Sequence, residues 1–284
     1  MVSAPAALPP LRDVIALFDL QAKKALGQHF LTDANLLAKV VRAAGSLDGM
    51  LVVEVGPGPG GLSRAILESP ARALVAIEMD ARCVPALQSL QDVYGPRFTL
   101  QQGDALKQPL ASIGEGPRAV VANLPYNVGT QLVVNWLQEV AQHGRLALQH
   151  FTVMLQKEVA ERMVAKVGDA AYGRLSVLLQ QFTDAEMMFD VPPGAFSPPP
   201  KVISSVLHAR VLERPREDVP LKALEQVVAA AFNHRRKMLR QSLKSLEVDA
   251  VAWCERAGID PTLRAENCTL AMFADLVRAR EALR

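Results

Sequence analysis

Short apolar runs recur over the first 160 residues of the chain, with segments of helical length between them. Runs that are apolar at nearly every position are typical of strands buried on both faces, as in a parallel sheet. Segments such as GGLSRAILES and TQLVVNWLQEVAQ between the runs are plausible helices. This alternation predicts an α/β fold with a doubly wound, mostly parallel sheet. The runs are MLVVEV (50–55), ALVAIE (73–78), FTLQQ (98–102), AVVANL (119–124) and TVMLQ (152–156).

Two later apolar stretches differ because a Pro-rich connection, VPPGAFSPPPK (191–201), joins them. The stretches are LSVLLQQFTDAEMMFDV (175–191) and KVISSVLHARVL (201–212), and both are strand-like. We therefore expect an antiparallel hairpin at one edge of the sheet, which brings a Rossmann-like sheet to seven strands.

A change in composition follows at LERPREDVP (212–220), which combines two prolines with dense charge. Only helical periodicity follows it, so we place a domain boundary there. The expected parts are a flexible Pro-rich lead-in over 1–22, an α/β domain over 23–212 and a small helical domain over 213–284.

The stretch VVEVGPGPGGLSRAIL (52–67) places a glycine-rich turn between a strand and a helix. Glycines let a turn adopt positive φ and let a ligand approach the backbone, so such a turn can bind a nucleotide-like ligand. Pro57 and Pro59 remove two amide donors, which makes the turn a poor cradle for a pyrophosphate and argues against NAD. With Glu54 before it, the turn resembles motif I of the S-adenosylmethionine (SAM) methyltransferases. The alternative is a merely flexible turn.

Two acidic residues follow the next two strands. Glu78 ends the second run, where a carboxylate can accept hydrogen bonds from ribose hydroxyls. Asp80 is the alternative candidate for this role, and the other possibility is that either acid is simply solvated at the strand end. Asp104, in QQGDAL, could accept from an adenine amino group, or it could cap a helix or form an Asx turn. The glycine-rich turn, Glu78 and Asp104, taken together in this order along the chain, are a more specific signal than any one of them.

The stretch VVANLPYN (120–127) ends a buried strand with an amide, a proline and an aromatic ring. An aromatic amino group is a poor nucleophile because its lone pair is delocalised into the ring, and two acceptors for its N–H groups would favour the pyramidal geometry of attack. Asn123 can offer its side-chain oxygen, and Pro125 can fix the direction of the Leu124 carbonyl. Tyr126 can stack on a flat base. The alternative is an ordinary turn after a strand.

A base within a helix is out of reach, so the target must be single-stranded or flipped out. Phe196, in GAFSPPP, is the candidate for a second ring against the base, and a core phenylalanine is the alternative.

At this point the chain resembles the small-subunit (16S) ribosomal RNA adenine dimethyltransferases. The resemblance runs from about Lys23 to Leu246 and implies SAM-dependent transfer of two methyl groups to the 6-amino group of each of two adjacent adenosines near the 3′ end of 16S rRNA. It also implies a role in late small-subunit assembly. The matching strings are KKALGQHFL, EVGPGPGGL, GDA, NLPYN, MLQKEVAERMVA, YGRLSVLLQ, PPGAFSPPPKV and FNHRRKMLRQSL.

The family's cofactor contacts, carried over by motif, fall on residues in five separate stretches. Position 29 is Asn in some relatives, and either side chain can form hydrogen bonds. The resemblance also implies a helix that begins near Asp33 and lies over the cofactor. The implied cofactor contacts are His29, Leu31, Gly56, Glu78, Asp104 and Asn123.

The segment AFNHRRKMLRQSLKSL (231–246) contains five basic residues and no acid. Helical spacing places Phe232, Leu239, Leu243 and Leu246 on one narrow apolar stripe with cations beside it. Such a helix could dock by its stripe and hold phosphates, although a solvated basic face is the alternative. The predicted RNA-binding residues are Arg235, Arg236, Lys237, Arg240 and Lys244, with the pair at 23–24 and the segment QKEVAERMVAK as further candidates.

The bulk composition adds limits to this picture. The formal net charge is only +2, so any RNA-binding surface must be local. The cysteines are Cys83, Cys254 and Cys268, which form no CxxC pair, so we expect no disulfide framework, no metal and a reducing cytoplasm. No apolar run reaches the length of a membrane span, the N-terminus lacks the features of a signal peptide, and a monomer is the default.

Four other functions compete with the leading one. A resistance-type large-subunit rRNA adenine methyltransferase would share the glycine turn and the NLPY stretch. A mitochondrial relative serving transcription would need a transit peptide, which is not evident. A non-catalytic assembly factor would not need the intact NLPY stretch. A nicotinamide dehydrogenase is disfavoured by the prolines in the turn.

Overall fold

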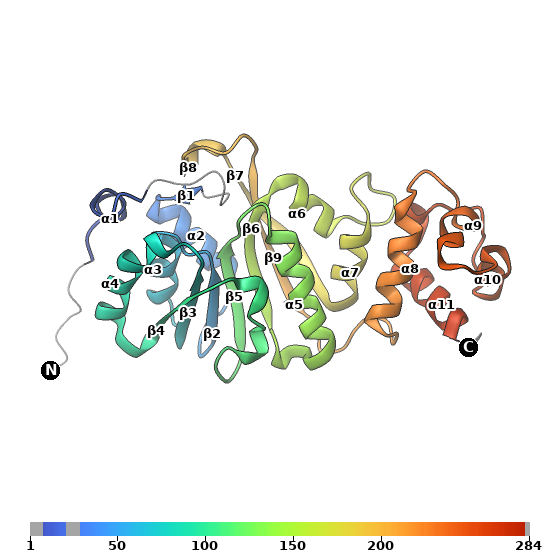
Figure 1. Cartoon of the computed structure of the whole chain (residues 1–284), viewed down its shortest axis with the longest axis horizontal. Coiled ribbons are helices and arrows are strands. Elements are labelled where there is room, and N and C mark those ends of the chain that lie inside the picture. Colours follow the sequence, from blue (N-terminus) through green and yellow to red (C-terminus); the bar gives the residue numbers. More distant parts are fainter. Residues whose placement is uncertain (1–7, 21–28, 282–284) are drawn as a thin grey trace. The chain divides into compact units, whose positions relative to one another are not determined.

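The computed structural model describes residues 8–20 and 29–281 (Figure 1). The chain divides into two compact units. Unit 1 lies within Met1–Ala160 and Glu186–Val211, and unit 2 lies within Glu161–Ala185 and Leu212–Arg284. The chain passes between the units at three points, one of which, between Val211 and Leu212, lies one residue from the expected boundary after 212. The other two bring residues 161–185 into unit 2, where no change in composition marks them.

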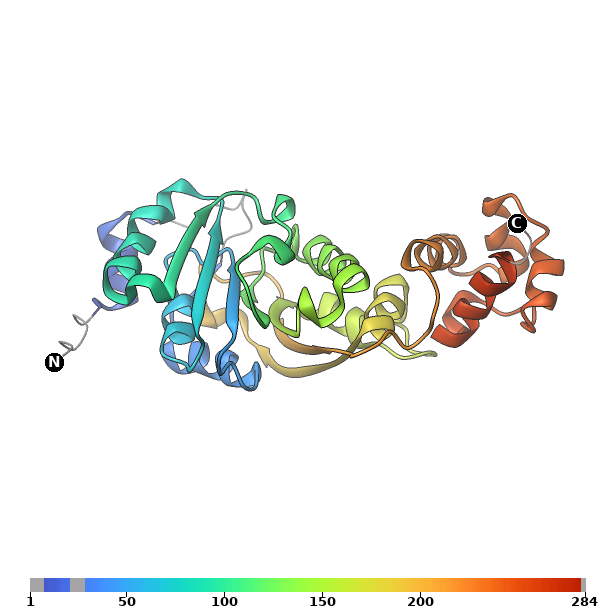
Figure 2. The ribbon, with the colours of Figure 1, turned by 90° about the horizontal axis from the view of Figure 1, so that it is seen from below.

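A seven-stranded sheet forms the centre of unit 1, with helices flanking it (Figures 1 and 2). Its order is β4-β3-β2-β5-β6-β9-β7. The first five strands of this order are parallel, and β9 is antiparallel to β6. The predicted fold class is therefore confirmed. The strands are β2 (Leu51–Val55), β3 (Ala73–Glu78), β4 (Phe98–Gln102), β5 (Arg118–Asn123), β6 (His150–Gln156), β7 (Thr183–Val191) and β9 (Ser204–Val211).

Every residue of β2 is buried, and so are the first five of β5. Strands buried on both faces must be apolar at consecutive positions, which is why these runs can be recognised in the sequence. The core of the unit combines these strands with the apolar faces of the flanking helices. The helices of this core are α2 (Ala34–Ala43), α3 (Gly61–Leu67) and α4 (Val84–Tyr94), and α5 (Gly129–His143) also buries an apolar face.

A separate two-stranded sheet joins the segment at residue 30 to the Pro-rich connection. Here β1 (Phe30–Leu31) pairs antiparallel with β8 (Phe196–Ser197). The register places Phe30 opposite Ser197 and Leu31 opposite Phe196. Two segments far apart in the sequence are thus fixed against one another, and this pairing positions part of the site described below.

The lead-in expected over 1–22 is not irregular where it is described, because α1 occupies Leu11–Leu17. Its apolar residues follow helical spacing, and Val14 is buried in the core of unit 1 with Leu20. Pro9 also accepts a hydrogen bond through its carbonyl from Arg64 Nη1 at 2.5 Å. Residues 1–7 and 21–28 lie outside the described part.

The stretch expected to be a strand from 175 is helical over its first half. Residues Arg174–Phe182 form α7, and β7 begins only at Thr183. Seven of the nine residues of α7 are buried, so its apolar positions do not alternate with polar ones. A short run that is apolar all round fits a buried helix as well as a buried strand, and this explains the wrong prediction.

Unit 2 contains a helical core of its own. Trp253 donates from Nε1 to the Leu276 carbonyl at 2.8 Å, and Tyr172 donates to the Cys268 carbonyl at 2.9 Å. Both side chains are buried, and these bonds satisfy their polar atoms. Helix α6 (Lys157–Val164) leads into the unit, and the further helices are α8 (Leu221–Asn233), α9 (Leu239–Ser242), α10 (Ala250–Arg256) and α11 (Leu270–Glu281).

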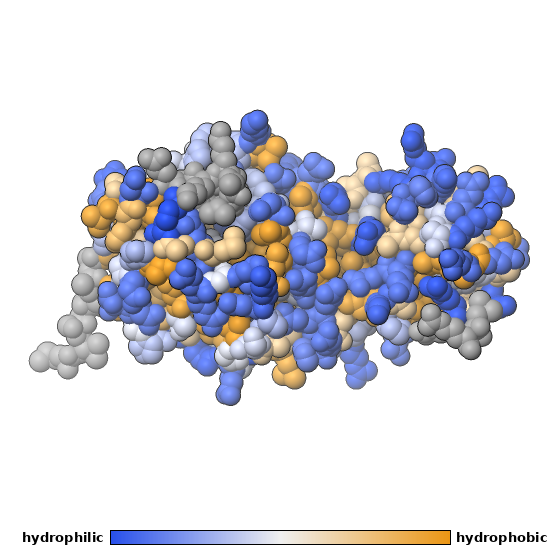
Figure 3. All heavy atoms as spheres, viewed as in Figure 1, coloured by the Kyte–Doolittle hydropathy of each residue, from blue (hydrophilic) through white to orange (hydrophobic). Residues whose placement is uncertain are grey.

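Hydrophobic and hydrophilic residues are interspersed on the viewed face in Figure 3. Within residues 8–20 and 29–281, the structure contains no helix with the length and apolar composition that a membrane crossing requires.

Candidate active site

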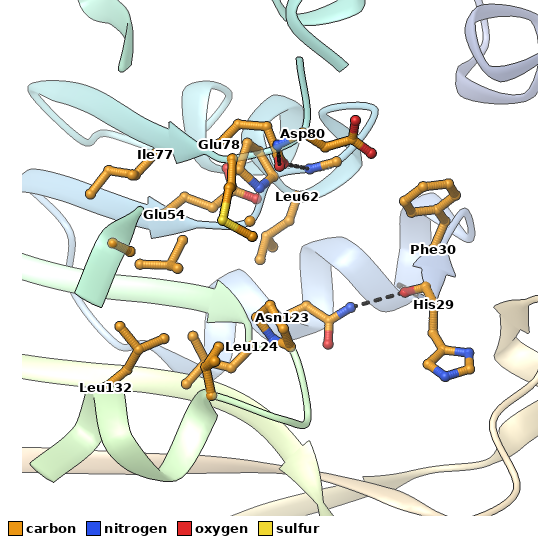
Figure 4. Close-up of a pocket in the computed structure, with 18 of the residues that line it drawn as sticks. His29, Phe30, Glu54, Leu62, Ile77, Glu78, Asp80, Asn123, Leu124 and Leu132 are labelled. Atoms are coloured by element: carbon orange, nitrogen blue, oxygen red, sulfur yellow. Dashed lines mark hydrogen bonds between the residues drawn. The ribbon is translucent and has the colours of Figure 1, made fainter. Parts of the chain in front are cut away.

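A cavity opens at the carboxyl ends of the parallel strands of unit 1 (Figure 4). Ligands of open α/β sheets bind at this edge because the strand-to-helix turns meet there. The end of β2, the end of β3, the turn after β4, the end of β5 and residues 29–31 all contribute to its lining. The structure therefore brings together the candidate residues His29, Leu31, Gly56, Glu78, Asp104, Asn123, Leu124, Pro125 and Tyr126.

The glycine turn lies close against its neighbours, as its composition predicts. Gly56 and Gly58 have φ values of +68° and +56°, which side chains rarely tolerate. A Cβ on Gly58 would lie 3.0 Å from the Phe30 ring, so a side chain there would also collide with β1. The turn is thus fixed by backbone conformation and by the absence of side chains.

Glu78 holds this turn. Its Oε2 accepts from the Gly58 amide at 2.9 Å, and its Oε1 accepts from the Asp80 amide at 2.7 Å. The side chain is buried, and this burial raises the pKa of Glu78 while the backbone donors oppose the rise. Each oxygen retains a lone pair, so a role in binding ribose stays a prediction. Asp80, the alternative candidate, is engaged by Arg82 at 2.6 Å.

Glu54 lines the same cavity, although the sequence marked it only as the acid before the turn. It is 1% exposed, and its Oε2 accepts from the Ser63 hydroxyl at 2.5 Å. Burial raises the pKa of Glu54 to about 8, the Ser63 bond opposes this rise, and nearby Glu78 adds to it. A buried acid near the end of the strand that precedes the glycine turn is the signal that could have identified it.

Asp104 and Met79 lie on the lining beside these acids. Asp104 accepts from the Leu106 amide at 3.0 Å and so caps a short 3₁₀ turn, which leaves its other oxygen for a ligand. Met79 is 59% exposed, so its apolar side chain is available to cover a flat ring. No pattern in the sequence singles out Met79.

The charges of the lining indicate the kind of ligand. Among its described residues are carboxylates, and there is no lysine or arginine. A pyrophosphate would meet repulsion here, whereas SAM carries a sulfonium and an ammonium that these acids attract. The residues present therefore fit SAM better than a dinucleotide. The carboxyl groups are Glu54, Glu78, Asp80 and Asp104, of which Glu54 adds little charge near neutral pH because its pKa is raised to about 8.

The amide of Asn123 is oriented at the tip of β5. Its Nδ2 donates to the His29 carbonyl at 3.2 Å (Figure 4). Because a carbonyl can only accept, this bond identifies which end of the amide is nitrogen. The Oδ1 atom is turned away from His29 and remains an acceptor on the cavity lining.

A second acceptor lies next to Asn123 in the chain. The Leu124 amide donates to the Met154 carbonyl at 3.1 Å, which fixes this peptide against β6. The Pro125 carbonyl accepts from Val128 and Gly129. Among the described residues, no group donates to the Leu124 carbonyl. Asn123 Oδ1 and the Leu124 carbonyl are therefore left without a donor among the described residues, and their role as a pair of acceptors for a base stays a prediction.

Tyr126 lies beside this pair with its hydroxyl 2.6 Å from Ser204 Oγ. Burial raises the pKa of Tyr126, and the bond to Ser204 opposes the rise. The ring closest to it is that of His29, with centroids 5.4 Å apart and planes tilted by 30°. His29 is thus placed beside both Asn123 and Tyr126.

Phe196 does not occupy the predicted position against the base. It is 5% exposed, belongs to the core of unit 1 and is not among the residues that line the cavity. Its pairing with Leu31 turns it inward, which is the core role considered as the alternative. The His29 ring lies 6.5 Å from it, nearly perpendicular.

In unit 2, the helix expected over 231–246 is interrupted. Helix α8 ends at Asn233, and α9 begins at Leu239. The amides of Leu239 and Arg240 donate to the carbonyls of Leu263 and Pro261, so these donors are satisfied outside the helix. The apolar stripe still packs, because Leu239 and Leu243 are both 0% exposed.

The predicted RNA-binding cations differ in their contacts. Arg235 bonds to Glu266 at 3.0 Å and to the Ala170 carbonyl at 2.7 Å, so it is engaged within unit 2. The other candidates are at least partly exposed, namely Arg236, Lys237, Arg240 and Lys244. Lys23 and Lys24 lie outside the described residues. The part of the chain that the structure describes also shows no cluster of three or more side chains suited to a metal.

A doubly wound sheet with a glycine turn after β2, an acid ending β3 and an acid-lined cavity without lysine or arginine fits the class of SAM-dependent methyltransferases. The chain belongs to the ribosomal RNA adenine dimethylase family, whose model matches residues 19–281.

Two relatives are named ribosomal RNA small subunit methyltransferase A. The one from Sinorhizobium fredii is 52% identical over 271 residues, which is 95% of this chain and 89% of the relative. The one from Paracoccus denitrificans is 52% identical over 282 residues, which is 99% of each. The resemblance noted in the sequence is confirmed.

Two solved structures share the fold. A dimethyladenosine transferase from Plasmodium falciparum gives a TM-score of 0.71 at 24% identity, over 87% of this chain and 96% of that one. The 23S rRNA methyltransferase ErmE gives 0.65 at 23% identity, over 89% and 99%. At these identities the likeness supports the architecture alone.

Proposed function

We propose that the chain transfers methyl groups from SAM to the 6-amino groups of two adjacent adenosines near the 3′ end of 16S rRNA, with S-adenosylhomocysteine as the other product. The family and the names of the relatives support an adenine of small-subunit rRNA as substrate. One observation in the structure carries the chemistry. The Asn123 amide is held through Nδ2, so that Oδ1 and the Leu124 carbonyl are both left as acceptors.

When bound, SAM supplies a sulfonium methyl group that is already activated for transfer. The protein's task is to make a poor nucleophile attack that group. Asn123 Oδ1 and the Leu124 carbonyl accept the two N–H groups of the adenine, which favours a pyramidal nitrogen whose lone pair points at the methyl carbon. The resulting N-methylated cation is acidic and loses its proton to water, so no strong base is needed.

Tyr126 provides the flat surface against which the flipped base stacks. Its hydroxyl contact to Ser204 fixes the tilt of the ring. Apolar lining around the strand tip, including Leu132, excludes water from the reacting atoms.

The exposed cations of unit 2 are proposed to contact RNA phosphates, which would supply affinity rather than sequence choice. Choice of the target would then come from RNA shape in the assembling subunit. We propose that the enzyme acts as a monomer in the cytoplasm and needs no metal.

The alternatives share parts of this arrangement. A large-subunit substrate is disfavoured because the relatives at about half identity are named for the small subunit. A purely structural role in assembly would not require a fixed orientation of the Asn123 amide. Binding to the small subunit is compatible with methyl transfer as an additional function.

Tritiated SAM and small subunits from a strain that lacks this methylation provide the test. The purified chain should label 16S rRNA, and mapping should place the label on the 6-amino groups of adjacent adenines near the 3′ end. Large subunits in a parallel reaction should stay unlabelled. Label on the large subunit alone, or no label on either, would overturn the proposal.

A further inference from the structure

Asn123 does not hold its orientation by itself. Its Nδ2 donates to the backbone carbonyl of His29 at 3.2 Å, and the His29 side chain in turn donates from Nδ1 to the Pro198 carbonyl at 2.8 Å. Phe30, which follows His29, is paired with Ser197, which precedes Pro198, in the small sheet of β1 and β8. Residue 29 therefore connects the strand tip to the Pro-rich connection.

We propose that His29 is a positioning residue for methyl transfer, which acts by anchoring its own carbonyl so that Asn123 presents Oδ1 to the adenine amino group. This inference rests on the proposed function and deepens it. In this proposal the anchoring hydrogen bond is the one that Nδ1 of the imidazole donates to the Pro198 carbonyl. A side chain at this position that lacks a donor there would leave the carbonyl unanchored.

The orientation of the Asn123 amide decides whether it helps or hinders. With Nδ2 bonded to His29, Oδ1 accepts from the substrate amino group. If the amide rotated by half a turn, its NH₂ group would face the N–H groups of the adenine, and two sets of donors would oppose each other. One hydrogen bond donated by Nδ2 to a fixed carbonyl therefore selects the productive rotamer.

The His29 ring is also held on its flanks. Tyr126 lies 5.4 Å away at a tilt of 30°, and Phe196 lies 6.5 Å away at 78°. This packing limits the movement of the imidazole and keeps Nδ1 aimed at Pro198. Phe196 does not line the cavity, but it supports the site through this contact with the His29 ring.

Three substitutions at position 29 separate this role from others. In His29→Asn the amide nitrogen can occupy the place of Nδ1, whereas in His29→Gln the amide lies one bond farther out, near the place of Nε2. His29→Leu retains bulk without any donor. We expect His29→Asn to keep the single-turnover rate within about threefold of the wild type at saturating SAM and RNA. His29→Gln and His29→Leu should each lose about tenfold or more.

Affinity for SAM, measured by calorimetry, separates this role from the cofactor contact that the resemblance implies for position 29. The rate at saturating SAM should fall in His29→Gln and His29→Leu whatever their affinity for SAM, because the proposed effect is on orientation. Thermal unfolding of each variant identifies any loss that comes from misfolding. Equal losses of rate in His29→Asn and His29→Gln would overturn the inference, as would a loss confined to SAM affinity.

A second readout does not depend on the substrate. The side-chain NH₂ resonances of Asn123, assigned by their absence in Asn123→Ala, should shift in His29→Gln and His29→Leu and stay in place in His29→Asn. Unchanged resonances in all variants would contradict the inference even if the wild type methylated its RNA. Absence of methylation by the wild type, with the shifts as expected, would instead contradict the proposed substrate.

Discussion

The acid-lined cavity of unit 1 and the basic segment of unit 2 place charge in opposite ways. The cavity collects buried acidic residues from strand ends far apart in sequence, such as Glu54 and Glu78, which are 1% and 5% exposed. The basic segment presents neighbouring residues, such as Arg236 and Arg240, to solvent. A buried acid depends on specific hydrogen-bond partners, whereas exposed cations each contribute little and act through their summed charge. Removal of one group should therefore have sharp effects in the cavity and graded effects on the basic segment.

The largest expected effect comes from Asn123→Ala in the cavity. Loss of one of the two acceptors should slow single-turnover transfer by roughly 10²–10³-fold, as loss of one preorganised group does elsewhere. Subunit binding should stay within a few-fold, and transfer is measured at saturating SAM. Asn135→Ala, an amide on α5 bonded to Gln131 and outside the cavity lining, is the matched control. If subunit binding fell together with transfer, Asn123 would be structural.

Glu54→Gln should change how stability depends on pH. The folded pKa of Glu54 is raised to about 8 from 4.5, so the stability it provides is present below pH 4.5 and is lost as pH rises towards 8. Between pH 5 and 7 the wild type should lose roughly 2–3 kcal/mol of unfolding free energy from this group, and the variant should not. Urea unfolding across this range checks it, with the exposed Glu68→Gln as control. Parallel pH profiles of wild type and Glu54→Gln would contradict the burial of an acid here.

Gly58→Ala should weaken SAM binding about tenfold or more, because the new Cβ would lie 3.0 Å from the Phe30 ring in a residue with φ +56°. Gly45→Ala provides the comparison, since its φ is +73° and a Cβ there would meet nothing within 4 Å. Both should lose about 1–2 kcal/mol of stability from backbone strain. Only Gly58→Ala should lose cofactor affinity in calorimetry, and equal affinities would show that the turn is not part of the cofactor site.

The double reversal Arg236→Glu and Arg240→Glu should weaken RNA binding in a manner that depends on salt. Each lost phosphate contact should reduce the slope of log affinity against log salt by about one. A salt titration of RNA affinity measures the slope for the wild type and the variant. A slope that does not change would place the RNA-binding surface elsewhere.

The smallest effect expected is a difference between two adjacent arginines. Arg235→Met removes the bonds to Glu266 and to the Ala170 carbonyl, which should cost about 1 kcal/mol of stability. Arg236→Met should leave stability unchanged and lower RNA affinity instead. Chemical denaturation and RNA titration of both variants check this. Equal effects of the two substitutions would mean that the cations of this segment act alike.

Much of the cavity could be predicted from the sequence because of where its residues stand in the chain. Gly56, Glu78 and Asn123 each lie at or directly after the end of a buried parallel strand, and the carboxyl ends of such strands meet at one edge. Strand periodicity alone is therefore enough to predict that these residues lie close together.

Other features depended on contacts that no local pattern records. Phe196 is in the core because β8 pairs with β1, a segment far away in the sequence. In the basic segment, α8 ends at Asn233, and the amides of Leu239 and Arg240 donate to the carbonyls of Leu263 and Pro261, contacts that helical periodicity does not record. Helix α7 replaces the first half of an expected strand because its surroundings bury it on nearly all sides.

The sequence by itself determined the class of fold, the family and the residues at the strand tip, because strand burial and motif order are local properties of the chain. Only the tertiary structure decided which way those residues face. The orientation of Asn123 depends on His29 and, through it, on Pro198, which lies 169 positions from His29. A hydrogen bond between distant segments is formed by folding, and composition or periodicity does not encode its direction.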